Sequence, residues 1–105
     1  MINKNKTGLS KHIENKIVKI VLSYKKPDKI LLFGSRATGY FTEKSDIDIA
    51  LFGKKWDEGD LNEIKFRLDE CLSTPLKIDI VNFYSSGNKR LKSRILNEGR
   101  LLYES

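Results

Sequence analysis

A chain of 105 residues and 12.1 kDa is long enough for one compact domain with a real core, and too short for two of ordinary size. Its hydrophobic fraction of 39% is slightly below the globular norm but far above that of disordered chains, and its uninterrupted apolar runs are too short for a membrane span or a secretory signal core. One cysteine and one histidine exclude an internal disulfide and a zinc site of the usual kind, and we interpret the chain as cytoplasmic.

The net charge of +6 is distributed unevenly along the chain. Residues 1–29 carry +6, residues 30–86 carry −3, and residues 87–105 carry +3. Basic flanks of this kind are either a solvated lysine-rich surface or an attraction for a polyanion such as a nucleoside triphosphate or RNA. Charge alone leaves both interpretations open.

Residues 1–9 are polar and lack periodicity, which predicts a flexible N-terminus followed by a single domain over residues 10–105. The domain is expected to begin with a helix capped by Ser10, because apolar residues then recur at helical spacing. Pro27 and the two lysines before it end this helix. Its apolar stripe consists of Ile13, Ile17, Ile20, Val21 and Tyr24.

Three segments carry strand patterns. Residues 30–33 form an apolar run closed by Gly34, which is typical of a strand buried on both faces. Residues 46–52 and 77–82 alternate, so each of these strands presents one apolar face to a core. Residues 34–39 form a glycine-bracketed turn between the first two strands.

A second long helix is predicted between the second and third strands. Its start is expected at a capping box formed by Asp60 and Glu63, and it stops before Pro75. Cys71 fits its apolar stripe and is interpreted as a small buried group. Trp56, just before this helix, either packs against it or is exposed for a partner.

Asn88 is expected to cap a last helix, with Gly99 at its C′ position and residues 101–103 packing afterwards. The predicted order is therefore helix, strand, turn, strand, helix, strand, helix. Four basic side chains of the last helix are either a solvated face or a contact for RNA or an acidic partner. They are Lys89, Arg90, Lys92 and Arg94.

Asp46 and Asp48 are the strongest chemical signal in the sequence. Aspartate is disfavoured in strands, yet these two occupy one strand face at i and i+2, about 6.6 Å apart along the chain. Their mutual repulsion, roughly 2.5 kcal/mol at an effective dielectric near 20, would be reversed by a divalent cation between them. Asp79, on another strand between two isoleucines, is the obvious third ligand.

Three carboxylates without His or Cys favour a hard cation that takes phosphate oxygens, namely Mg²⁺ or Mn²⁺. The alternative is structural, because an Asp-x-Asp pair can face solvent at a sheet edge or pair with lysines such as Lys44 and Lys77. Asp79 taken alone suits a solvated edge position.

The turn at Gly34 and Ser35 lies at the carboxyl end of the first predicted strand. Such a turn lets backbone N–H groups approach an anion, and a helix after Ser35 would direct its positive end at phosphate. The spacing to Gly39 matches a Walker A loop superficially. Tyr40 and Phe41 occupy the positions where that motif needs Lys and Ser or Thr, so a P-loop NTPase is excluded.

The two motifs together closely resemble the signature of the minimal nucleotidyltransferases, in the DNA polymerase beta superfamily. The motifs are Leu32-Phe33-Gly34-Ser35-Arg36-Ala37-Thr38-Gly39 and Ser45-Asp46-Ile47-Asp48-Ile49-Ala50. The order of helices and strands is similar to that family over about residues 10–103. The resemblance implies an α/β (α+β) fold, with a small mixed sheet and helices packed against it. It also implies transfer of a nucleoside monophosphate from a nucleoside triphosphate to an acceptor hydroxyl.

The resemblance also implies roles for individual residues. The implied site residues are Gly34, Ser35 and Arg36 for the nucleotide, and Asp46, Asp48 and Asp79 for catalysis and for two Mg²⁺ or Mn²⁺ ions. Asp79 corresponds to the family's more variable third carboxylate, which binds one metal and helps remove the acceptor proton. Arg36 is alternatively an ordinary surface arginine.

Larger members of the family append domains that bind the base and the acceptor, and 105 residues leave no room for one. Acceptor recognition is therefore expected from a partner. Bacterial proteins of this type are often encoded beside a small helical HEPN-domain protein. The resemblance thus suggests a toxin–antitoxin pair in which this chain is the antitoxin and modifies the toxin with AMP from ATP.

Two other functions fit the sequence. One is a non-catalytic antitoxin or interaction module that retains the fold, and the other is a nucleic-acid-binding domain that uses the basic flanks. Three mutually repelling aspartates favour catalysis, since a module that only binds has no evident use for them. The acceptor, the preferred base and any homo-oligomer remain open.

Overall fold

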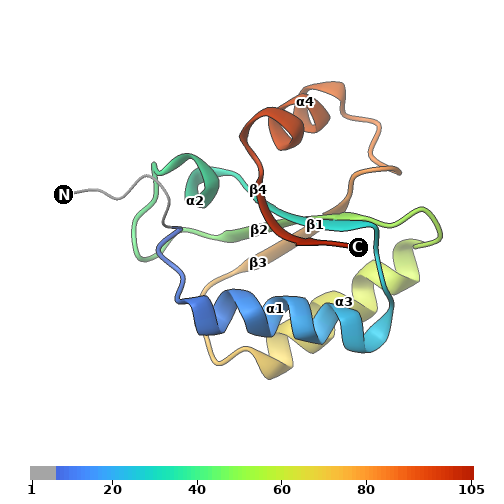
Figure 1. The fold of residues 1–105 in the computed structure, drawn as a ribbon. Helices are drawn as coiled ribbons and strands as arrows, with labels where there is room; N and C mark the ends of the chain where they lie inside the picture. The colour runs from blue at the N-terminus through green and yellow to red at the C-terminus, as the bar shows by residue number, and fades with distance from the viewer. Residues whose placement is uncertain (1–6) are drawn as a thin grey trace.

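A computed structural model describes residues 7–105, which alternate between helices and strands (Figure 1). The elements in chain order are α1 (Lys11–Tyr24), β1 (Lys29–Phe33), α2 (Ser35–Thr38), β2 (Ile47–Phe52), α3 (Glu58–Cys71), β3 (Ile78–Asn82), α4 (Lys89–Glu98) and β4 (Arg100–Glu104). None of the helices in this part of the chain is long and apolar enough to cross a membrane.

The strands form one mixed sheet in the order β3-β2-β1-β4. β1 is antiparallel to both β2 and β4, whereas β2 and β3 are parallel. The predicted α/β (α+β) fold with a small mixed sheet is therefore confirmed. The parallel pair brings the side chains of the second and third predicted strands into direct register, which positions the candidate site.

The segment at residues 101–103 was expected only to pack after the last helix, and it is part of edge strand β4. Its register with β1 shifts between Ile30 and Leu31. Because of this irregularity Leu102 and Tyr103 both pack against the same core cluster, while Leu101 is 56% exposed. The simple alternation that identifies a strand in a sequence is lost at such a point.

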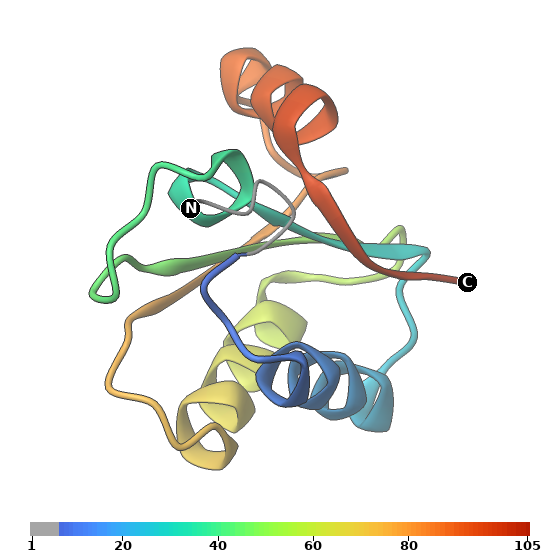
Figure 2. The same cartoon turned by 60° about the vertical axis from the view of Figure 1, so that its left-hand side comes forward.

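Helices cover the two faces of the sheet unequally. In both views α1 and α3 lie side by side beneath the sheet, and α4 lies above it (Figures 1 and 2). The larger core lies between the sheet and the α1–α3 layer. Its fully buried members are Ile17, Val21, Ile30, Leu32, Ile47, Ile49, Leu51, Ile64 and Leu68. The smaller core on the α4 side comprises Leu31, Phe33, Ala50, Phe52 and Ile95. Residues on β1 contribute to both cores, as the apolar run predicted.

Helix α3 begins three residues earlier than predicted. Its N-cap is Asp57, whose side chain accepts a hydrogen bond from the backbone N–H of Asp60 (2.9 Å) and which forms a reciprocal capping box with that residue. The predicted capping box of Asp60 with Glu63 is therefore wrong. Asp57 and Asp60 have the same three-residue spacing, and this earlier pair caps the helix. Cys71 is exposed rather than buried, since the following Leu72 occupies the core position at the helix end.

The predicted caps of α1 and α4 are confirmed, whereas the conformation of Gly99 differs from the prediction. The Ser10 cap of α1 is confirmed by its hydrogen bond from the N–H of Ile13 (3.1 Å), and Asn88 caps α4 in the same way. Gly99 is extended, with φ −64° and ψ 144°, because the chain continues directly into β4. Trp56, which the sequence left undecided, is buried in the larger core.

Part of the predicted flexible segment 1–9 is described by the structure. Residues 1–6 lie outside the described residues. Thr7 is only 3% exposed, and its hydroxyl donates a hydrogen bond to the carboxylate of Glu14 (2.7 Å) and accepts one from the N–H of Leu9 (3.2 Å). Thr7 and Leu9 therefore contact the domain in this structure, and the flexibility of residues 1–9 stays a prediction.

Candidate active site

The predicted phosphate-binding turn forms at the carboxyl end of β1. Gly34 adopts φ +76° and ψ −156° and precedes the single turn of α2, and the N–H groups of Ala37 and Thr38 bond back to its carbonyl (3.1 and 3.3 Å). Gly39 ends the turn in the left-handed conformation at φ +89°. Glycine is required at both positions because other residues rarely adopt positive φ.

Gly34 is required for a second reason, which is its contact with β2. Phe33 pairs with Asp48 in the antiparallel register, so the turn begins beside the Asp48 side chain. A Cβ atom on Gly34 would collide with the Asp48 carboxylate. The positive φ of Gly34 and this close contact with the Asp48 carboxylate together favour glycine at the start of the turn. The sequence indicated both motifs, but it did not indicate that they touch.

Asp48 also lies beside Asp79, because these residues are direct partners in the parallel β2–β3 pair. Asp46 is exposed and immediately precedes β2. Lys77 approaches Asp79, with 3.8 Å between the ammonium and carboxylate groups. The structure thus places Asp48 between the glycine turn on one neighbouring strand and a second carboxylate on the other.

The carboxylates share one electrostatic environment. Burial raises the pKa of Asp48 above its ordinary value, and the negative charges of Asp79 and Asp46 raise this pKa further. Lys77 and Arg94 act in the opposite direction and do not offset these effects. A half-buried acid with a raised pKa and two acidic neighbours is a common property of functional sites, where a cation or a substrate relieves the repulsion.

The donor set fits a hard cation in its chemistry. Within residues 7–105, no three His, Cys, Asp or Glu side chains converge closely enough to enclose an ion as they stand. The three carboxylates nevertheless offer only oxygen atoms, which Mg²⁺ and Mn²⁺ prefer, and their repulsion favours uptake of positive charge. Assignment of Asp46, Asp48 and Asp79 as metal ligands remains a prediction.

Arg36 is buried, so its interpretation as a surface arginine is wrong. Only 1% of the residue is exposed, and burial lowers the pKa of its guanidinium. The guanidinium lies over the ring of Phe41, 5.2 Å from its centroid. It donates hydrogen bonds to four backbone carbonyls, those of Thr7 (2.9 Å), Ser45 (3.1 Å), Thr42 (3.4 Å) and Glu43 (3.4 Å).

These contacts connect the two motifs of the candidate site. Arg36 belongs to the glycine turn, and Ser45 directly precedes Asp46. The guanidinium therefore holds the loop that leads to the first aspartate, and it also holds the N-terminal segment at Thr7. Sequence reasoning missed this positioning role, because the backbone carbonyls that a buried arginine binds have no signature in the sequence.

Comparison with known proteins agrees with this geometry. The family model described as polymerase beta, nucleotidyltransferase matches residues 15–105, which is most of the chain. The chain belongs to the polymerase beta nucleotidyltransferase family. The resemblance inferred from the glycine turn and the aspartate pair is thereby confirmed at the level of the family.

Relatives of this nucleotidyltransferase include a protein of Methanocaldococcus jannaschii named "Putative protein adenylyltransferase". It is 34% identical over an 84-residue alignment that covers 71% of this chain and 77% of that protein. A solved toxin–antitoxin structure with AMP-PNP shares 30% identity, covering 88% of this chain and 73% of that one, with a TM-score of 0.75. The toxin–antitoxin structure MntA–HepT shares 26% identity, covering 91% and 74%, with a TM-score of 0.72.

Proposed function

We propose that this nucleotidyltransferase transfers AMP from ATP to a hydroxyl group of a partner protein, as the antitoxin of a toxin–antitoxin pair. One observation carries the proposal: Asp48 lies directly between the glycine turn of β1 and Asp79 of β3. The turn that we propose to bind phosphates therefore lies beside the carboxylates at one end of the sheet. The names of the relatives, which include an adenylyltransferase and toxin–antitoxin structures, support the choice of reaction and setting.

The proposed roles follow from the position of each residue. The N–H groups around Gly34 and the hydroxyl of Ser35 bind the triphosphate. Asp46, Asp48 and Asp79 would hold two Mg²⁺ or Mn²⁺ ions, and the metal would supply charge neutralisation at the phosphates and a lower pKa for the acceptor hydroxyl. Arg36, first counted among the nucleotide-binding residues, acts by positioning the loop before Asp46.

The transfer itself is an in-line displacement at phosphorus. The acceptor hydroxyl oxygen forms a bond to the α-phosphorus of ATP, and the bond from that phosphorus to the oxygen bridging to the β-phosphate breaks. Pyrophosphate leaves, and the hydroxyl proton passes to the carboxylate of Asp79. The product is a phosphodiester between AMP and the partner's tyrosine, serine or threonine.

A protein acceptor suits a domain of this size. A docked partner obtains binding energy and orientation from its whole interface, so the site itself needs to enclose only one side chain. We propose that the partner is a HEPN-domain toxin. The non-catalytic antitoxin remains the second candidate, because the toxin–antitoxin relatives support a partner protein independently of any chemistry.

Intact-mass measurement separates these two functions. The chain is mixed with a HEPN-domain protein encoded beside it, together with ATP and Mg²⁺, and the partner is expected to gain the mass of one AMP or a small multiple. Asp48→Asn should abolish the gain, while Asp69→Asn, on the exposed face of α3, should retain it. A stable complex that suppresses toxicity without any mass change, even with Asp48→Asn, would establish the non-catalytic function.

A further inference from the structure

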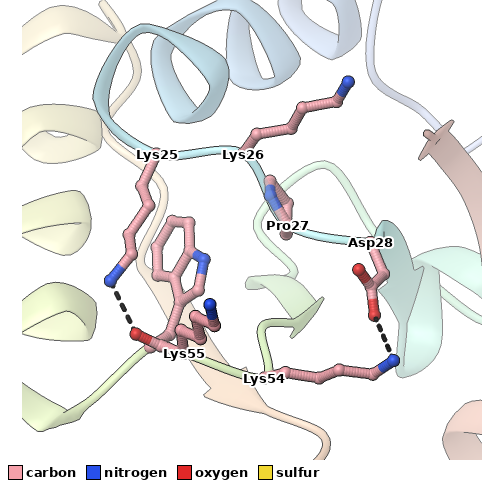
Figure 3. Close-up of a pocket in the computed structure, with 7 residues that line it drawn as sticks. Lys25, Lys26, Pro27, Asp28, Lys54 and Lys55 are labelled. Carbon is pink, nitrogen blue, oxygen red and sulfur yellow. Dashed lines mark hydrogen bonds and ion pairs between the residues drawn. The ribbon is translucent and has the colours of Figure 1, made fainter.

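A cavity of about 240 Å³ lies between the segment after α1 and the loop after β2 (Figure 3). We call it the lysine pocket, and its lining residues are Lys25, Lys26, Pro27, Asp28, Lys54, Lys55 and Trp56. Asp28 directly precedes β1, and Lys54 follows soon after β2 ends. The lysine pocket therefore lies at the opposite end of the β1–β2 pair from Gly34 and Asp46.

Hydrogen bonds fix both walls of the lysine pocket. The buried side chain of Asn82 donates to the carbonyls of Gly53 (2.8 Å) and Trp56 (3.3 Å) and accepts from the N–H of Gly53 (3.2 Å). The ammonium of Lys25 bridges the two walls by donating to the carbonyl of Lys55 (2.6 Å), as Figure 3 shows. These hydrogen bonds hold the backbone of the two walls in place on either side of the cavity.

The lysine pocket has an excess of positive charge, because its lining carries four ammonium groups and one carboxylate, and only one further carboxylate, that of Asp60, pairs with one of the four. Lys25 is paired with Asp60 (2.9 Å), and Lys54 approaches Asp28 (3.7 Å). The ammonium groups of Lys26 and Lys55 have no ion pair or hydrogen bond to any residue in the range 7–105. In Figure 3 the exposed side chain of Lys26 extends away from the other lining residues, so it has to turn inward to contact an anion in the cavity. Two cationic donors are therefore free to meet an anion.

Trp56 supplies a further donor in the wall. The residue is 7% exposed, and its indole N–H is buried with no acceptor among the described residues. Its ring packs edge-on against Tyr24, with the ring centroids 5.8 Å apart, and the Lys25 ammonium lies over it. Buried donors without acceptors are rare in native proteins, so an acceptor from outside the chain would satisfy this N–H. Its nitrogen has almost no accessible surface in the structure, so an anion reaches it only when the neighbouring lysine side chains move.

We propose that the lysine pocket binds a small, multiply charged phosphate of the pyrophosphate or nucleotide-phosphate class. A single carboxylate would neutralise only part of the excess positive charge, whereas a phosphate anion offers several oxygens to lysines from both walls and to the indole N–H. This site is separate from the carboxylates and goes beyond the proposed transfer reaction. It provides a second place where a substrate or product anion binds.

The protein contains one tryptophan, so its indole N–H resonance is assigned without ambiguity and reports on the surroundings of Trp56 in this pocket. Titration with inorganic pyrophosphate in the absence of metal should shift that resonance in a saturable manner, while acetate at equal ionic strength should not. Lys26→Ala with Lys55→Ala should weaken pyrophosphate binding about tenfold or more, the effect of losing one charge-assisted hydrogen bond. The matched control, Lys11→Ala with Lys89→Ala, removes the same charge from exposed helix starts and should bind as the wild type does.

Three results would overturn the proposal. Equal weakening by both double variants would show that pyrophosphate senses only the overall charge, and a shift with acetate would show no selectivity for phosphate. A response lost in Asp48→Asn but kept in Lys26→Ala with Lys55→Ala would place the anion at the carboxylate site instead. Saturable binding that is unaffected by Asp48→Asn supports the lysine pocket even if the transfer reaction is never observed.

Discussion

Removing the charge of Asp48 should stabilise the metal-free protein. Asp48 and Asp79 are direct partners on neighbouring strands, which lie about 4.8 Å apart, so their carboxylates repel by roughly 3 kcal/mol at an effective dielectric near 20. Partial exposure to solvent and the opposing charges of Lys77 and Arg94 reduce this considerably. We expect a net gain of about 1 kcal/mol for Asp48→Asn near neutral pH, or about 4 °C in Tm for a domain of this size.

The pH dependence of this gain follows from the raised pKa of Asp48. A carboxyl whose pKa is higher in the folded than in the unfolded state favours folding when protonated, and this contribution is lost as the pH rises through the folded-state pKa. The difference between Asp48→Asn and the wild type should therefore be present at neutral pH. It should shrink as the pH falls through the carboxyl range and Asp48 becomes protonated in the wild type.

Thermal unfolding followed by circular dichroism in EDTA, at several pH values, measures both effects. The matched control is Asp69→Asn, which loses an exposed pair with Lys65 (3.0 Å) and should lower stability by about 0.5 kcal/mol or less. A neutral-pH Tm for Asp48→Asn below that of the wild type would refute the reasoning. So would a stabilisation that persists unchanged at acid pH, since it could not come from the charge.

Three further predictions test the other parts of the site. Mg²⁺ with ATP should raise the Tm of the wild type through binding to the native state, and Asp48→Asn should lose most of that rise; an unchanged wild-type Tm would contradict the metal and nucleotide assignments. Gly34→Val should lower the Tm by several degrees and abolish transfer, because valine is strained at positive φ and its side chain collides with Asp48, whereas Ser35→Ala should fold normally and keep some activity. Equal and mild effects of these two variants would argue against a phosphate-binding turn. Arg36→Lys should accelerate amide hydrogen exchange in residues 42–45, and it should lower kcat while changing the KM for ATP little. Unchanged exchange would exclude the proposed positioning role.

Local patterns in the sequence were enough to predict most elements and both motifs. The helical stripe from Ile13 to Tyr24 and the alternation in β2 each arise from one face meeting the core, and this periodicity is visible in the sequence. Strand β4 was missed because its register irregularity disrupts alternation at an edge. The error at Asp60 arose because two overlapping acidic pairs have the same spacing, and only the structure shows which of them caps the helix.

Relations between distant segments could not be predicted in this way. The contact of Gly34 with Asp48 depends on the antiparallel register of β1 and β2, and the burial of Arg36 depends on carbonyls from two separate segments. The lysine pocket likewise combines a segment before β1 with a segment after β2, and its lysines look like ordinary surface residues in the sequence. Such arrangements are properties of the tertiary fold and leave no local pattern.

The most direct measurement of the central claim follows a radioactive label from ATP to the partner protein. The chain and its HEPN-domain partner are incubated with Mg²⁺ and ATP labelled at either the α- or the γ-phosphate, and the partner is then separated and counted. Nucleotidyl transfer predicts that the partner acquires the α-label and none of the γ-label, and that Asp48→Asn abolishes this incorporation. Incorporation of the γ-label would indicate phosphoryl transfer instead, and incorporation that survives Asp48→Asn would contradict the role assigned to the carboxylates.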